Sequence, residues 1–253
     1  MKVTVLDRTT GREKTMCQAA RGDYMAEWNG EKTFEEVMDV VNYDDRDLDR
    51  AKEKNNYPEL SDETEAKLIS FIEKQLSRGH YGPMEQSSIT FTVKNVSRSL
   101  MAQITRHRHL TFDVQSQRYV DFSDTEAITP ESLLNPDHFS REDGMLDITE
   151  EEQTELREKY ETITTEQFEY YEELVDAGIP KEDARFVLPI GTPVNMTFSG
   201  NARTMMHVLN LRQKATSQWE IRELSNMVAE HLESWMPYTF EWWEENGPVK
   251  NSP

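Results

Sequence analysis

The chain has 253 residues, of which 36% are hydrophobic and 30% charged, and a formal net charge of −20 at pH 7. This length can bury a sizeable core in one or two domains. Acidity spread along the whole chain disfavours nucleic acids and anionic membranes as partners, and it suits a cytoplasm of high salt. No apolar run approaches the roughly 20 residues of a membrane helix, and the first residues do not resemble a secretory signal. The single Cys17 excludes an internal disulfide framework and a cysteine-rich zinc site, so we expect a soluble, cytoplasmic protein without a metal site.

The first third of the chain is predicted to combine one strand with helices. Residues 2–6 alternate as a short strand does, and residues 13–40 are compatible with short helices. Residues 42–60 are rich in Asp and Asn, which predicts an acidic surface insertion. A helix then runs from Asp62 to about Ser77, because apolar residues recur on one side of it, and Gly79 ends it.

The next stretch begins with a tight loop at residues 79–85 and a half-buried strand at residues 89–93, where apolar residues alternate with threonine. Asn95 or Ser97 can cap the following helix. On that helix Gln103 and Arg106 share a face. The spacing therefore places the triplet Arg106-His107-Arg108 at the C-terminal end of a helix. The loop after it carries Ser116 and Arg118.

Two segments carry positive charge in this otherwise acidic chain. Residues 97–119 hold four arginines and one acid, and residues 184–222 have a net charge of +4. Guanidinium groups bind phosphates through two parallel hydrogen bonds. We therefore expect the two basic segments to form one site for phosphorylated small molecules.

The remainder of the chain is predicted to be mainly helical, after a surface loop at residues 123–148. The expected elements are, in order, a long helix from a capping box at Thr149–Glu152 to Gly178, a short helix from Pro180, a strand at 193–198, a helix capped by Asn201 and a last helix at about 217–234. These elements make one α+β domain over residues 1–253.

The pattern Gln103-x-x-Arg106-His107-Arg108, followed by seven residues and then Ser116-x-Arg118-Tyr119, resembles the signature of the flavin-dependent thymidylate synthases (ThyX). Further blocks resemble that family in the same order. They are G-H-x-x-P-x-E at 79–85, Ser97-Arg98, A-R-x-V-L-P at 184–189, and N-A-R, N-L-R and Q-W-E-I within 201–221. Together the five blocks span residues 79–221, over half the chain, which makes the resemblance specific.

The resemblance implies the reductive methylation of dUMP to dTMP, with FAD as cofactor and with methylenetetrahydrofolate and a reduced nicotinamide, NADPH, as co-substrates. It implies a homotetramer whose active sites form between subunits, and a single α+β domain with a small antiparallel sheet and several long helices. The positions that match cofactor-binding residues of the family are His80, Gly82, Glu85, Arg106, His107, Arg108, Asn201, Arg203 and His207. Those that match dUMP-binding residues are Gln103, Arg106, Gln115, Ser116, Gln117, Arg118, Arg185 and Arg212. Arg212 also matches the arginine that acts on the uracil ring in catalysis.

The residue types fit this chemistry. An arginine against the N3/O4 edge of uracil would stabilise negative charge as it develops, and the flavin supplies the redox step. No protein nucleophile is then required, which agrees with Cys17 lying outside every motif. The unrelated class of thymidylate synthase attacks uracil with a cysteine, and the sequence offers no such setting.

Three positions depart from the family pattern. Val114 stands where the family often has Glu, Gly82 where Ser or Thr is common, and His207 where some members have Asn. Because of Val114, one alternative is a flavin- and nucleotide-binding regulator that has lost synthase activity. Another is an RNA- or DNA-binding module that uses R-H-R-H as a basic patch, but the net charge argues against it.

Overall fold

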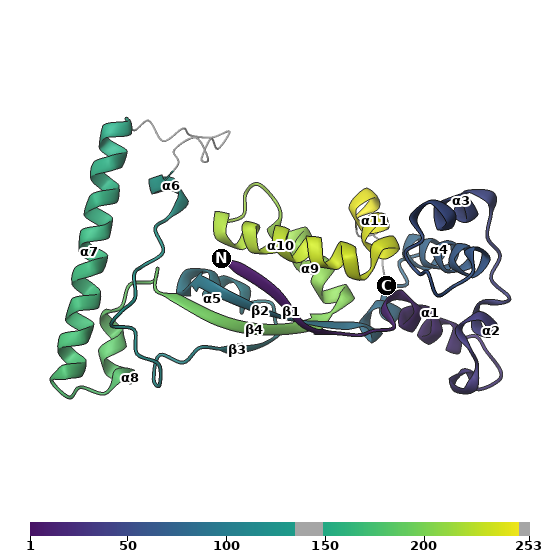
Figure 1. Ribbon diagram of the computed structural model, residues 1–253, viewed down its shortest axis with the longest axis horizontal. Helices are drawn as coiled ribbons and strands as arrows, with labels where there is room; N and C mark the ends of the chain where they lie inside the picture. The colour runs from purple at the N-terminus through teal and green to yellow at the C-terminus, as the bar shows by residue number, and fades with distance from the viewer. Residues whose placement is uncertain (135–148, 248–253) are drawn as a thin grey trace.

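The computed structural model describes residues 1–134 and 149–247, arranged around a four-stranded antiparallel sheet (Figure 1). The part of the predicted 123–148 loop that follows residue 134 lies outside the described residues. The strand order is β1-β2-β4-β3. The strands are β1 (Lys2–Arg8), β2 (Ser88–Ser97), β3 (Thr111–Val114) and β4 (Pro193–Asn201). This confirms the α+β class with a small antiparallel sheet.

One face of the sheet is apolar and the other is polar, because side chains alternate along each strand. Phe91 of β2 pairs with Phe198 of β4, and both are buried with their rings 5.4 Å apart. Such a cross-strand pair contributes about 0.2–1 kcal/mol. Helices α5 (Arg98–Ile104), α9 (Ala202–Arg212) and α10 (Trp219–Trp235) lie on one side of the sheet (Figure 1) and contact it. The apolar strand positions therefore form the floor of the core.

A bulge near the end of β2 sets the start of α5. The pairing of β2 with β4 shifts between Val93 and Val96, and Asn95 there has a left-handed φ of 61°. The extra residue turns the chain so that Ser97 caps α5, its Oγ accepting from the backbone N–H of Leu100 at 2.9 Å. The predicted cap at Ser97 is thus confirmed, and Asn95 forms the bulge.

Four helices gather at one end of the molecule (Figure 1): α1 (Arg12–Gly22), α2 (Phe34–Met38), α3 (Asp45–Lys54) and α4 (Asp62–Ser77). A short 3-10 turn, η1 (Asn29–Glu31), separates α1 from α2. Helix α4 has the predicted bounds. The segment predicted as an acidic surface insertion, residues 42–60, contains α3, which packs on α4, and its Ala51 and Tyr57 are fully buried. Two buried apolar residues within an acidic segment give too weak a sequence signal for this helix.

The long helix α7 (Glu150–Asp176) stands at the opposite end of the molecule, with the short α6 (Glu131–Leu134) beside it (Figure 1). Its predicted capping box is present, with Thr149 and Glu152 bonding each other's backbone N–H. Gly178, at φ 89°, supplies the left-handed residue that follows it. The short α8 (Lys181–Ala184) and η4 (Arg185–Val187) then lead into β4.

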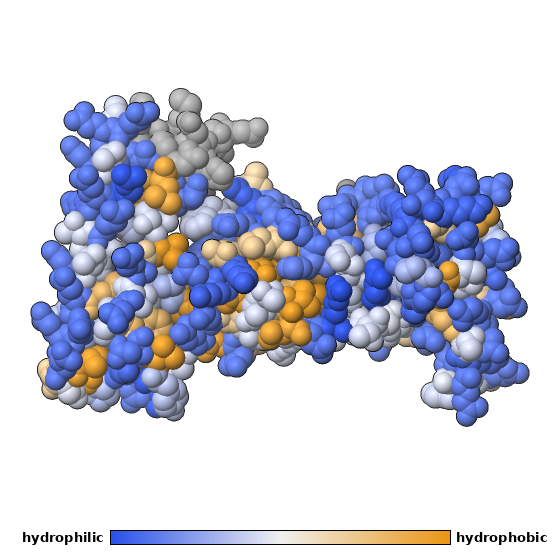
Figure 2. Space-filling model, in the orientation of Figure 1, coloured by the Kyte–Doolittle hydropathy of each residue, from blue (hydrophilic) through white to orange (hydrophobic). Residues whose placement is uncertain are grey.

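The described residues include a further helix that the sequence analysis did not predict. After α10, Pro237 begins α11 (Pro237–Asn246), so the helix at 217–234 is not the last. Trp242 and Trp243 are buried there and belong to the hydrophobic core, which also includes Val3 of β1. Figure 2 shows hydrophilic side chains over much of both ends, with hydrophobic ones over the middle of the molecule and over the lower part of the α7–α8 end.

Candidate active site

The Arg-His-Arg triplet lies in a turn and not on a helix. Helix α5 ends at Ile104, and the backbone N–H of His107 then donates to the carbonyl of Ile104 at 3.0 Å. Such i to i−3 bonds tighten and end a helix. The expectation that the triplet belongs to the end of the helix is therefore wrong by about one turn. As a result Arg106 and Arg108 are exposed while His107 is half-buried.

A hydrogen bond joins the two basic segments. Nε of Arg212, the last residue of α9, donates to Nε2 of His107 at 2.9 Å. Arginine has only donors, so Nε2 must be unprotonated and the imidazole is neutral with its hydrogen on Nδ1. Burial lowers the pKa of His107 to about 4, helped by the charges of Arg212, His207 and Arg106. Sequence reasoning brought these four residues to one site, and they lie together.

We expect the imidazole of His107 to titrate in NMR spectra with a midpoint near pH 4, far below its usual 6.5. The folded chain then binds fewer protons than the unfolded chain between these values. The stabilising contribution of the neutral His107 is therefore present above pH 6.5 and lost as the pH falls through about 4.

The variant Arg212→Ala should raise the His107 midpoint, because it removes a positive charge and leaves most of the burial. A midpoint near 6.5 in the unaltered protein, read from the ring carbon shifts, would contradict the assigned pair.

A second group lies where the 3-10 turn η2 (Gly82–Gln86) meets the start of α9. Nη1 of Arg203 donates to Oε1 of Glu85 at 2.7 Å, and its guanidinium lies 6.0 Å from the ring centre of Tyr81. Both ionic side chains are about two-fifths exposed, so the pair adds little stability and is open to a ligand. At Gly82 an added Cβ would meet nothing within 4 Å, so space does not require glycine there.

Two other cofactor-matching residues flank this group. Asn201 caps α9, its Oδ1 accepting from the backbone N–H of Thr204 at 2.9 Å, as predicted. His207 is exposed on the same helix, between Arg203 and Arg212. The cap and the first half of α9 therefore carry the cofactor-matching residues, and Arg212 ends the helix.

A third group gathers arginines beside α8. Nε of Arg118 donates to the Glu182 carboxylate at 2.6 Å, and Nε of Arg185 donates to the backbone carbonyl of Glu182 at 2.9 Å. The Oγ of Ser116 accepts from the backbone N–H of Arg118 at 3.2 Å. Burial and the neighbouring Arg185 lower the pKa of Arg98. Like charges this close favour an anion between them.

Two of the glutamines that match dUMP-binding residues form hydrogen bonds with other residues of the chain. Nε2 of Gln103 donates to Oε1 of Gln218 at 3.4 Å. Oε1 of Gln115 accepts from the backbone N–H of Asn195 at 2.9 Å, and Gln117 is buried. Sequence reasoning missed Gln218 and Asn195, which hold Gln103 and Gln115. It also missed Glu182, which accepts from Arg118 and Arg185.

Val114 lies on β3 opposite Met196 and packs half-buried against the core. Asp113, the acid next to it, is exposed on the other face of the strand. Asp113 therefore cannot present a carboxylate from the position that the family often gives to Glu.

The second and third groups lie at opposite ends of β2. The backbone N–H of Ala202 donates to the Ser87 carbonyl at 2.9 Å, which places the Glu85–Arg203 pair at the start of that strand. The backbone N–H of Arg98 donates to the Thr192 carbonyl at 3.1 Å at the strand's other end. Ten residues of strand span roughly 33 Å. One small ligand cannot touch both groups of the same chain.

Within residues 1–134 and 149–247, no helix is long and apolar enough to cross a membrane. In the same part of the chain no group of three or more His, Cys, Asp or Glu side chains is placed to hold a metal ion.

Comparisons with known proteins agree with the motifs. The family model described as "Thymidylate synthase complementing protein" matches residues 4–238. The flavin-dependent thymidylate synthase of Halobacterium salinarum is 41% identical, over 96% of this chain and 95% of its own length. That of Haloarcula marismortui is also 41% identical, over 97% and 96%.

A solved structure shares the fold. It is a UMP/dUMP methylase, PolB, from Streptomyces cacaoi bound with 5-Br dUMP, and it aligns with a TM-score of 0.73 at 23% identity. The alignment covers 100% of this chain and 97% of that one. With the family model over most of its length and two near-full-length relatives at 41% identity, the chain belongs to the flavin-dependent thymidylate synthase family.

Proposed function

We propose that this chain methylates dUMP to dTMP with bound FAD, taking the carbon from methylenetetrahydrofolate and the hydride from NADPH, without a protein nucleophile. The observation that carries the proposal is the Arg212–His107 hydrogen bond. In this bond the neutral imidazole of His107 holds the guanidinium of Arg212 in place. The two relatives at 41% identity are named flavin-dependent thymidylate synthases.

Arg212 is suited to act on a uracil ring for two reasons. Its Nε is fixed by His107, while its terminal Nη groups have no hydrogen bond to any described residue and remain able to donate. Because His107 is neutral, it does not compensate the guanidinium charge as a carboxylate would. Arg212 would therefore place an undiminished positive charge against the N3/O4 edge, where negative charge develops during the reaction.

The residues proposed to hold FAD fit an anionic dinucleotide. Arg106 and Arg108 are exposed next to His107. Arg203 forms a partly exposed ion pair with Glu85, which a ligand can reach. Guanidinium donors suit a pyrophosphate, and His80 and Gly82 lie in the loop that precedes Glu85. When bound, the flavin supplies the hydride chemistry, and the chain binds and orients the rings.

The arginines beside α8 are proposed to bind the dUMP phosphate. Arg185 repels Arg98, and Arg118 is held by the Glu182 carboxylate through an exposed pair of low stability. A phosphate dianion would relieve the repulsion and compete with Glu182 for Arg118, while Ser116 Oγ lies beside the backbone N–H of Arg118. Gln103, Gln115 and the buried Gln117 would orient the nucleotide from the adjoining segment.

We propose that the active site is shared between subunits of a homotetramer. The Glu85–Arg203 pair and the arginines beside α8 lie roughly 33 Å apart along β2, so a site that uses both groups needs them from different chains. Helix α7 also carries Leu156, Ile163 and Tyr170 at spacings of seven residues, each about half exposed. A stripe at this spacing is typical of a helix that packs on another helix.

Cys17 should not take part in the reaction. The thiol is fully buried on α1, and burial raises its pKa well above the usual value, so it is not a thiolate near neutral pH. We expect Cys17→Ala to leave the kcat for dTMP within about twofold, while unfolding free energy falls by about 1 kcal/mol for the lost packing. Loss of turnover in a variant that still unfolds cooperatively would indicate covalent catalysis by this thiol.

The proposed function is tested by steady-state dTMP formation with purified protein, FAD, dUMP, methylenetetrahydrofolate and NADPH, omitting one component at a time. We expect product only in the complete mixture. The alternative of an inactive flavin- and nucleotide-binding regulator is favoured by one observation, the apolar Val114 on β3. Bound FAD and dUMP without product in the complete mixture would support that regulator.

A further inference from the structure

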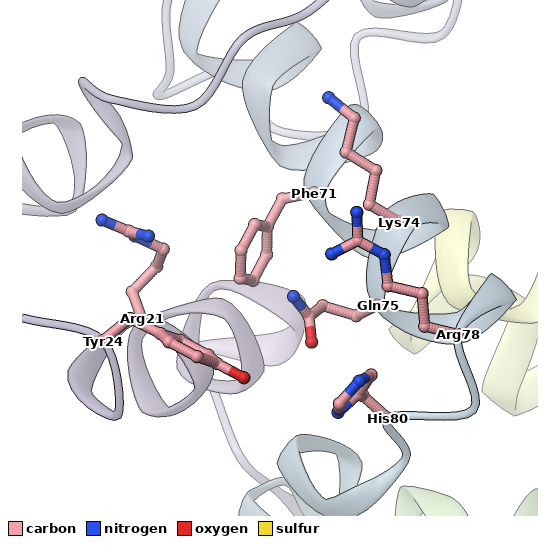
Figure 3. Close-up of a pocket in the computed structure, with 7 residues that line it drawn as sticks. All are labelled: Arg21, Tyr24, Phe71, Lys74, Gln75, Arg78 and His80. Carbon is pink, nitrogen blue, oxygen red and sulfur yellow. The ribbon is translucent and has the colours of Figure 1, made fainter. Parts of the chain in front are cut away.

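A cavity of about 250 Å³ opens between α1, the segment that follows it, and α4 (Figure 3). Its walls are Arg21, Tyr24, Phe71, Lys74, Gln75, Arg78 and His80. In Figure 3 the guanidinium of Arg78, the amide of Gln75 and the ring of His80 turn toward its middle, with the hydroxyl of Tyr24 facing them. None of the seven side chains is acidic, although the chain has a net charge of −20.

No described carboxylate forms an ion pair with the cations of this cavity. Among the described residues no ion pair involves Arg21, Lys74 or Arg78. The Nε of Arg21 is buried without a hydrogen-bond partner in the same part of the chain. Glu73, the nearest acid on α4, is paired with Arg50. A buried donor without a partner is costly, so the arrangement favours a ligand that accepts hydrogen bonds.

We propose that this cavity binds the terminal anionic group of a co-substrate, with Arg78 as its principal donor and Arg21 contributing from its rim. The inference rests on the proposed function, because His80 links the cavity to the flavin-matching loop. The shared chemistry is a group of two or more acceptor oxygens, either the carboxylates of a glutamyl tail on the folate or the 2′-phosphate of the nicotinamide cofactor.

The size of the cavity limits what it holds. Pockets for whole drug-sized ligands measure roughly 300–1,000 Å³, so about 250 Å³ accommodates one end of a co-substrate and not a whole dinucleotide. Phe71 and Tyr24 supply an apolar wall for the group that carries the charge. Two guanidinium groups on separate helical segments suit multidentate binding of carboxylate or phosphate.

The test is a calorimetric titration of the FAD-loaded protein with a triglutamate peptide and, separately, with adenosine 2′,5′-bisphosphate. We compare the natural chain with Arg21→Gln, Arg78→Gln and the control Arg46→Gln, whose side chain is 88% exposed outside the cavity. One ligand should bind, and each cavity variant should weaken it about tenfold while the control leaves it unchanged. Arg78 is itself exposed, so its variant should fold normally.

Kinetics then identify the source of the anion. If it is the glutamyl tail, the cavity variants should raise the KM for triglutamylated methylenetetrahydrofolate about tenfold with the KM for NADPH unchanged. If it is the 2′-phosphate, they should raise the KM for NADPH toward that for NADH. Absence of binding by both probes, or equal binding in all variants, would overturn the inference. Binding that depends on Arg21 and Arg78 in a protein that makes no dTMP supports the cavity and refutes the proposed function alone.

Discussion

Arg212→Ala is expected to keep FAD bound and to lower the kcat for dTMP formation by at least about 100-fold, the effect typical of removing one electrostatic donor from a developing anion. The reason is the position of Arg212, fixed through Nε by a neutral His107 and with its Nη groups able to donate. Visible absorbance of the desalted protein measures the flavin, and chromatography of the product measures turnover. The two readings separate catalysis from cofactor binding.

The matched control is Arg222→Ala. Arg222 lies on α10, and its Nη1 donates to the Ala215 carbonyl at 3.1 Å, on the surface. The control should leave kcat within about twofold. An Arg212→Ala enzyme as active as this control would refute the role assigned to Arg212.

Glu220→Ala is expected to lower the unfolding free energy by about 3 kcal/mol, because it leaves buried donors without an acceptor. Glu220 is 2% exposed and accepts from the backbone N–H of Ser97 at 2.7 Å and from the Ser97 hydroxyl. Ser97 in turn caps α5, so the carboxylate of Glu220 ties α10 to the helix that carries Gln103. Urea denaturation at fixed pH measures the loss, and the exposed Glu223→Ala on the same helix should change it by less than about 0.5 kcal/mol.

The effect of Glu220 should depend on pH in a defined direction. Burial raises the pKa of Glu220 above its usual 4.5, so the folded chain holds its proton more tightly than the unfolded chain. This contribution is fully present below pH 4.5 and is lost as the pH rises through the raised pKa. Glu220→Gln, which keeps an acceptor without titrating, should therefore remove this part of the pH dependence. An equal pH dependence in both proteins would contradict the assignment.

Local signals in the sequence predicted most of the fold. The capping residues Ser97, Thr149 and Asn201 are all used as caps, because a hydroxyl or amide oxygen can satisfy the first free N–H groups wherever the helix packs. The helices α3 and α11 were missed or misplaced, since they depend on burying a few residues such as Tyr57 and Trp242 against distant segments. That packing has no local pattern.

The sequence proposed which residues belong to the candidate site, but it did not predict how they are arranged in space. The two basic segments and the family resemblance assigned His107 and Arg212 to one site, and a hydrogen bond joins them in the structure. The sequence did not reveal that Arg185 and Arg203 lie at opposite ends of β2, because that follows from the length and pairing of the strands. Nor did it reveal Glu182, an acid just outside the basic segment whose carboxylate accepts from Arg118.

The central claim is that this chain transfers a methyl group to dUMP and does not merely bind it. The most direct measurement is a single turnover under anaerobic conditions, in which protein with reduced FAD is mixed with dUMP and methylenetetrahydrofolate in the absence of NADPH. We predict one dTMP per flavin, formed as the flavin is oxidised, and neither event without dUMP. Complete binding of dUMP with no dTMP would contradict the account.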